Sequence, residues 1–219
     1  MMEPKNNGSP RNALVALAVA LAYIAPQFAP GSPPAEARAW LGSGALQSLS
    51  QALFLLIIIG LTGPLPEFGL RRPRPSDIMH ALLLLGALLS LGMAMRWLWQ
   101  ESGSGLKALS SGQDSGLVTA LLIAGFSVAV GYREELFYRA YIMHSLRAHG
   151  ASPLASILLS TALFAAGHAY QGASGMASSA LLGLALAFAY SKGVRLHALA
   201  WAHAGYNALI LYGAMGFLS

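Results

Sequence analysis

The stretch Gly131–Tyr141, with the sequence GYREELFYRAY, decides how the chain has to fold. It places two adjacent glutamates, Glu134 and Glu135, and two arginines inside an otherwise apolar run. A charged side chain deep in a membrane helix costs about 2.5–3.5 kcal/mol on insertion scales, so such residues usually face a bundle interior or a cavity. We therefore expect this stretch to carry the functional site.

The composition around this stretch indicates a membrane-embedded chain. Hydrophobic residues make up 56% of the sequence and charged residues 10%, against roughly 45–50% and about 25% in soluble domains. Each membrane helix needs about 20 apolar residues. The 219 residues therefore predict one all-α integral membrane domain over residues 1–219, a polytopic transmembrane helix bundle with seven spans, or eight if one span breaks.

The apolar runs give approximate positions for these spans. We expect them at residues 12–29, 43–62, 77–99, 116–148, 153–170, 174–191 and 195–217. The first run could also be read as a cleaved secretory signal, but the multi-pass pattern that follows favours an uncleaved span. The segment 116–148 is too long for a simple crossing, so it should tilt, project into the cytoplasm or break near Gly131. Ser152 before Pro153 is typical of a helix start.

The basic residues lie in the connections between these runs. A net charge of +5 is explained by orientation and by contact with anionic lipid in the bilayer, and we expect no nucleic acid as a partner. With the N-terminus inside, the cytoplasmic side holds Lys5, Arg11, Arg71, Arg72, Arg74, Arg147, Lys192 and Arg195, and the outer side holds Arg38, Arg96 and Lys107. This asymmetry predicts a cytoplasmic N-terminus and an outer C-terminus, and we expect the plasma (inner) membrane.

Helical spacing distinguishes the two glutamates. Residues four apart are neighbours on a helix, so Glu135 can pair with Arg139. Glu134 lacks that partner, and a carboxylate in apolar surroundings suits the role of a general base. The alternative is that both glutamates merely neutralise Arg133 and Arg139, because ion pairs inside membranes are often structural.

Two later spans carry polar residues at the same spacing. Phe164 and His168 are four apart in the fifth span, and His203 and Asn207 are four apart in the seventh. Each pair therefore lies on one helix face. Because three helices present polar side chains in this way, we expect them to converge in the middle of the membrane or in its cytoplasmic half.

Taken in order, these motifs resemble the CaaX-protease and bacteriocin-processing (CPBP) family of intramembrane glutamic endopeptidases. The family pattern is Glu-Glu-x-x-x-Arg, then Phe-x-x-x-His, then His-x-x-x-Asn. It is matched by Glu134, Glu135 and Arg139, by Phe164 and His168, and by His203 and Asn207. The resemblance covers about residues 115–210 and implies a catalytic core there.

The resemblance implies a hydrolase that cleaves a membrane-associated protein or peptide. Glu134 and His168 would activate a water that attacks the scissile carbonyl, while His203 and Asn207 would donate hydrogen bonds to the oxyanion. Glu135, Arg139 and Phe164 would support them. No cofactor and no metal is implied. The family allows prenylated CaaX tails, leader peptides and C-terminal sorting anchors as substrates.

Two other readings of the same residues stay open. Glutamate and histidine are zinc ligands, so a zinc-dependent membrane protease is conceivable, although the chain lacks His-Glu-x-x-His and its candidates lie on different spans. The buried ionisable residues would also suit a proton-coupled transporter or a non-catalytic membrane partner such as an immunity protein. The sequence does not indicate an oligomeric state.

Overall fold

The computed structural model describes residues 18–19, 23, 37–99, 116–215 and 217. Every element in these ranges is helical, and no strand occurs in them. The elements are α2 (Ala37–Thr62), η2 (Leu65–Phe68), α3 (Pro75–Leu98), α4 (Leu117–Glu135), η4 (Leu136–Met143), α5 (His144–Ala148), α6 (Pro153–Ala166), η5 (Ala169–Gln171), α7 (Gly172–Ser191) and α8 (Leu196–Ala214). The predicted all-α fold class is confirmed for this part of the chain.

Four helical segments among the described residues are long and apolar enough to cross a membrane. They are Ala37–Thr62, Pro75–Leu98, Leu117–Ala148 and Ala169–Ser191. Helix α6 is apolar but shorter, and α8, which carries the second histidine motif, is not among the four. The predicted count of seven or eight spans is therefore not confirmed, and most of the expected first span at 12–29 lies outside the described residues.

The long segment 116–148 does not break near Gly131. It continues as α4, η4 and α5 in one helical run, and it widens into a π-helix at Leu136–Met143, directly after the two glutamates. Such widened turns are rare and occur frequently at functional sites.

The chain then turns, and α6 begins as predicted, since Ser152 Oγ accepts a hydrogen bond from the Ala155 amide at 3.1 Å.

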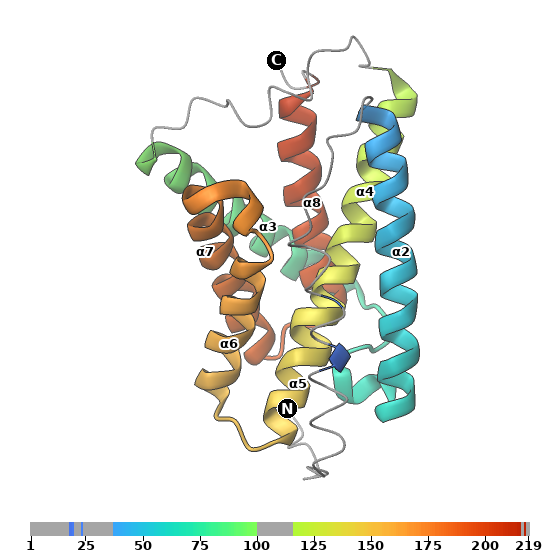
Figure 1. The fold of residues 1–219 in the computed structure, drawn as a ribbon, viewed down its shortest axis with the longest axis vertical. Coiled ribbons are helices and arrows are strands. Elements are labelled where there is room, and N and C mark those ends of the chain that lie inside the picture. Colours follow the sequence, from blue (N-terminus) through green and yellow to red (C-terminus); the bar gives the residue numbers. More distant parts are fainter. Residues whose placement is uncertain (1–17, 20–22, 24–36, 100–115, 216, 218–219) are drawn as a thin grey trace.

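Helix α4 lies between α2 and α8, and α8 also packs against α3, whereas α6 pairs with α7 (Figure 1). The contact between α4 and α8 is close at Gly131. A Cβ atom there would lie 2.9 Å from the Ala200 carbonyl oxygen and 3.1 Å from the Ala204 nitrogen, both in the backbone of α8. Since a backbone cannot move aside as a side chain can, the absence of a side chain at Gly131 permits this approach. It brings the following turn of α4, with its glutamates, next to α8.

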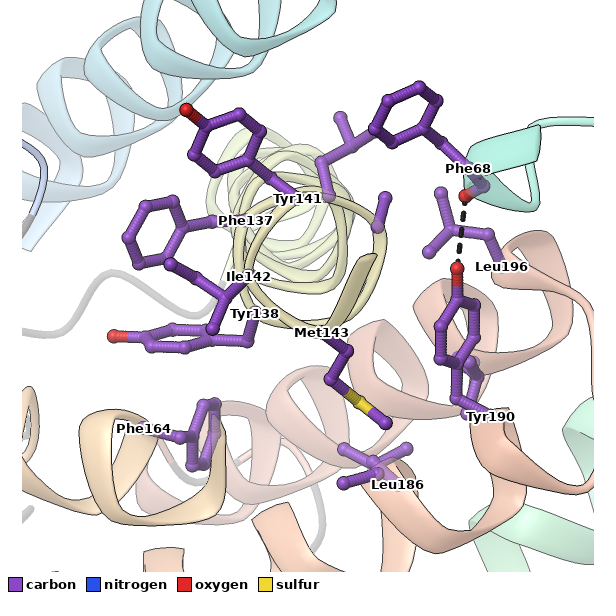
Figure 2. Packing of buried hydrophobic residues seen from close by; sticks show 14 of the residues in the cluster. Phe68, Phe137, Tyr138, Tyr141, Ile142, Met143, Phe164, Leu186, Tyr190 and Leu196 are labelled. Atoms are coloured by element: carbon purple, nitrogen blue, oxygen red, sulfur yellow. Dashed lines mark hydrogen bonds between the residues drawn. The ribbon is translucent and has the colours of Figure 1, made fainter. Parts of the chain in front are cut away.

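The π-helix η4 forms the centre of the larger hydrophobic core. All its residues from Leu136 to Met143 are buried. Figure 2 shows Phe137, Tyr138 and Tyr141 radiating from η4, with Phe164 facing it from α6. Within this core, the Tyr190 hydroxyl donates a hydrogen bond to the Phe68 carbonyl at 3.2 Å and ties α7 to η2. The glutamates therefore precede a segment that is fixed on all sides by packing.

Candidate active site

Glu135 lies at the centre of a buried polar cluster. Its side chain and that of Arg139 are fully buried, and Arg139 Nε lies 3.2 Å from Glu135 Oε2, the i, i+4 ion pair that the spacing predicts. The other oxygen, Oε1, accepts a hydrogen bond from His203 Nδ1 at 2.9 Å. Because a carboxylate only accepts hydrogen bonds, Nδ1 of His203 carries the hydrogen.

Glu134 is also buried, with 5% of its surface exposed, but it is not unpaired. Its Oε1 forms an ion pair with Arg133, which corrects the expectation that only Glu135 has an arginine partner. Its Oε2 lies 3.6 Å from His203 Nε2 and receives no hydrogen bond from the described residues. The imidazole of His203 therefore lies between the two glutamates.

Phe164 connects the remaining motif residues. Its ring centre lies 4.6 Å from that of His168 and 5.9 Å from that of His203, and the guanidinium carbon of Arg139 lies 5.0 Å from the same centre. Phe164 is 3% exposed. A single aromatic ring thus packs against side chains from three parts of the chain that carry motifs.

His168 lies just beyond the end of α6 rather than inside a span reaching residue 170. Its Nδ1 donates a hydrogen bond to the Phe164 carbonyl at 2.8 Å. In a neutral imidazole one nitrogen donates and the other accepts, so Nε2 is the accepting nitrogen of a neutral His168. The side chain is close enough to interact electrostatically with the Glu134 carboxylate.

Arg139 is enclosed by groups that neutralise or pack against it. Besides Glu135, its Nη2 donates to the Gly183 carbonyl of α7 at 3.3 Å. Gly183 is needed in this contact, because a Cβ there would lie 2.7 Å from Phe164 Cδ1. The Arg139 side chain therefore joins η4, α6 and α7 around the site.

Asn207 lies one turn beyond His203 on α8 and is half-buried. Its side chain forms no hydrogen bond within the part of the chain that the structure describes. The structure thus brings Glu134, Glu135, Arg139, Phe164, His168 and His203 together by hydrogen bonds, ion pairs and ring contacts, whereas Asn207 follows on the same helix and forms no hydrogen bond to them.

Helical spacing did not assign Arg133 to Glu134, although the alternative interpretation, in which both glutamates neutralise Arg133 and Arg139, included Arg133. Adjacent residues on a helix point about 100° apart and are not expected to face each other, but a long arginine side chain can fold back onto its neighbour. Tyr23 was missed as well, although its ring lies 5.9 Å from the Arg133 guanidinium carbon. No motif marks Tyr23, so only the packing of the chain reveals it.

The cluster combines two carboxylates, two guanidinium groups and two imidazoles in a buried place. Such a set can accept a proton from water, hold a charged intermediate and return the proton, which is general acid–base chemistry. Among the described residues, no group of three or more His, Cys, Asp or Glu is arranged to hold a metal ion.

Comparison with known proteins agrees with the motifs. A family model described as Type II CAAX prenyl endopeptidase Rce1-like matches residues 116–209, which contain all seven motif residues. Searches of curated proteins and of solved structures found no match. The family and the four apolar helices support an integral membrane protein with intramembrane endopeptidase activity. The resemblance that the motifs predict is confirmed over residues 116–209, where the chain is similar to the Rce1-like group of the CPBP family.

Proposed function

We propose that the protein is a glutamate-dependent intramembrane endopeptidase in which Glu134 and His168 activate the attacking water. The observation that carries this proposal is the environment of the Glu134 Oε2 atom. This oxygen is buried, receives no hydrogen bond from the described residues and faces His203 Nε2 at 3.6 Å. A water bound beside Oε2 would find a carboxylate that can accept its proton.

His168 supports the same step with its second ring nitrogen. Its Nδ1 hydrogen is held by the Phe164 carbonyl at 2.8 Å, so Nε2 of the neutral ring can accept a hydrogen bond from the water. In the proposed reaction one O–H bond of the water breaks and the proton moves to Glu134. The oxygen forms a bond to the scissile carbonyl carbon, and the carbonyl electrons move onto its oxygen. When the C–N bond breaks, Glu134 returns the proton to the leaving nitrogen.

His203 and Asn207 are the proposed donors to the oxyanion. Since His203 Nδ1 already donates to Glu135, His203 can serve the oxyanion only through Nε2, and only while that nitrogen also carries a hydrogen. The side-chain amide of Asn207 provides two further N–H groups one turn away. Removal of one oxyanion donor typically costs about 3–4 kcal/mol of barrier. Glu135, Arg139 and Phe164 are proposed as supporting residues that hold His203 and His168 in place.

The proposed substrate is a membrane-associated protein or peptide, with CaaX-type tails, leader peptides and C-terminal sorting anchors as the candidates. The proposed catalytic core is 115–210 within a single integral membrane domain over 1–219. No cofactor is required, since water, a base and hydrogen-bond donors suffice for the hydrolysis.

We also propose seven crossings in the plasma (inner) membrane, with a cytoplasmic N-terminus and an outer C-terminus. Two contacts support this topology. Arg195 forms a hydrogen bond to the Arg72 carbonyl, which joins two connections assigned to the cytoplasmic side. At the other end, Arg38 donates to Thr119 Oγ1 at 2.9 Å, so a residue assigned to the outer side lies beside the start of α4.

The test is cleavage of candidate membrane peptides by the purified protein in liposomes. We expect Glu134→Gln and His168→Ala to abolish cleavage, because loss of general base catalysis costs about 100-fold to 10,000-fold in rate. His149→Ala, a change at an exposed histidine in the connection before α6, is the matched control and should leave the rate unchanged. Full activity of Glu134→Gln would contradict the mechanism.

A further inference from the structure

The two oxygens of the Glu134 carboxylate have different surroundings. Oε1 is held by Arg133, whereas Oε2 lies beside His203 Nε2 and is free of hydrogen bonds from the described residues. A carboxylate without such a partner could turn so that neither oxygen lies beside His203. The ion pair with Arg133 opposes that turn, because the turn would break the ion pair in a buried place.

Arg133 itself is held by an aromatic residue from a distant part of the chain. Its guanidinium carbon lies 5.9 Å from the centre of the Tyr23 ring, within the range of a cation–π interaction. The side chain of Arg133 is 17% exposed, so it lies at the edge of the site, whereas Arg139 is fully buried.

Tyr23 is fixed independently of Arg133. Its ring stacks on Phe137 with centroids 3.7 Å apart and meets the edge of Tyr138 at 6.0 Å. Both partners belong to the buried π-helix η4, and Tyr23 is only 6% exposed. A residue that precedes the family-matched segment 116–209 is therefore packed against the turn that follows the glutamates.

We propose that Arg133 and Tyr23 are positioning residues for Glu134: Arg133 binds Oε1, Tyr23 holds the Arg133 guanidinium, and Oε2 thereby stays directed toward His203 and the substrate water. The inference rests on the proposed role of Glu134 as the base. It gives Tyr23, which belongs to none of the motifs, a part in catalysis.

The first test is the labelling of Glu134 by dicyclohexylcarbodiimide, a hydrophobic reagent that reacts with carboxyl groups in membranes. Mass spectrometry of the peptide that contains Glu134 gives the rate. In Arg133→Gln, Glu134 should be labelled at least about threefold faster than in the wild type, since the ion pair that shields its carboxyl group is lost. In Tyr23→Leu, Glu134 should also be labelled faster. Arg72→Gln, which changes an exposed arginine, should label at the wild-type rate.

The combination of both changes tests whether Tyr23 acts through Arg133. If Tyr23 acts through Arg133, Glu134 in the double variant Tyr23→Leu/Arg133→Gln should be labelled no faster than in Arg133→Gln alone, because the two changes are coupled. Tyr23→Phe retains the ring and should label like wild type. Additive effects, or a wild-type labelling rate in Arg133→Gln, would overturn the proposal.

The second test is kinetic. Arg133→Gln should lower kcat about 100-fold through misplacement of the base, with KM within about twofold of wild type, since the change does not affect ground-state binding. Arg133→Lys keeps the charge and should recover part of the loss. A rise in KM with unchanged kcat would overturn the positioning role. If the wild-type protein cleaves no peptide, the proposed function is contradicted. The positioning role can still be tested, because the labelling of Glu134 does not depend on cleavage.

Discussion

His203 and Glu135 are joined by a 2.9 Å hydrogen bond between α8 and α4, across 68 positions of the sequence. Both side chains are almost completely buried. This bond fixes the hydrogen on Nδ1 of His203 and turns Nε2 toward Glu134. Glu135 therefore links the ion pair with Arg139 to the imidazole beside the proposed base, and its loss should affect both folding and activity.

Glu135→Gln should destabilise the protein by about 3–5 kcal/mol, because it leaves the buried Arg139 without its counter-charge. Thermal unfolding in detergent measures this loss. Glu67→Gln, at an exposed glutamate of η2, is the control and should change stability by less than about 0.5 kcal/mol. An unfolding temperature of Glu135→Gln equal to that of wild type would show that the buried pair contributes nothing to the fold.

The double variant Glu135→Gln/Arg139→Gln should be less destabilised than the sum of its two single variants. Each single change leaves an unpaired charge in the core, whereas the double change removes both charges together. The same unfolding measurement on all four proteins gives the coupling. Simple additivity would mean that the two side chains do not interact, despite the 3.2 Å between Arg139 Nε and Glu135 Oε2.

His203→Ala should lower kcat at least about 100-fold, because it removes a donor to the oxyanion and leaves both glutamates without their shared neighbour. Cleavage of the same peptide in liposomes measures the effect. His80→Ala, which changes an exposed histidine of α3, is the control. If His203→Ala retains more than half the wild-type kcat, this histidine has no part in the chemical step.

Gly131→Ala should reduce both stability and activity, whereas Gly125→Ala should not. A methyl group at Gly131 meets the backbone of α8 at Ala200 and Ala204, and such overpacking costs about 1–3 kcal/mol. Gly125 lies on the same helix with open space around it, so alanine there should be neutral or stabilising by up to about 1 kcal/mol. Unfolding temperature and peptide cleavage are measured for both variants, and equal behaviour would contradict the close approach of α4 and α8.

Cleavage should continue after dialysis against a chelator. His203 Nδ1 donates to Glu135 Oε1, and Arg139 Nε lies 3.2 Å from Glu135 Oε2, so Glu135 does not present free ligand atoms to a metal ion. The measurement compares peptide cleavage before and after chelation, and again after zinc is added. Activity that disappears with the chelator and returns with zinc would favour a metal-dependent protease over the glutamate mechanism.

Several features of the fold follow from local sequence. The predicted runs 43–62, 77–99 and 174–191 correspond to α2, α3 and α7, because apolar runs of this length form helices and proline or glycine lies near their ends. The cap at Ser152 was also predictable, since it depends on residues three positions apart. The fifth run was placed too long, because the helix ends at Ala166 and the chain turns there before His168.

The proposed site was only partly predictable. The pair of Glu135 with Arg139 could be predicted because one helix turn separates the two residues. The pairing of Glu134 with Arg133 does not follow from the spacing rule, which says nothing of an arginine that folds back onto its neighbour, and Arg133 entered only through the alternative that the glutamates neutralise both arginines. The contact of Tyr23 with Arg133 likewise joins parts of the chain that no motif connects.

The sequence by itself determined the all-helical membrane class, the resemblance to the CPBP family and the residues that carry the motifs. These follow from composition and from spacing within single helices, which depend on short-range geometry. Only the tertiary structure decided that His203 lies between Glu134 and Glu135, that Arg133 takes one oxygen of Glu134 and that Phe164 contacts both histidines. Such contacts depend on how closely α4 and α8 approach at Gly131 and on how η4 is packed, and both are set by the arrangement of the whole bundle.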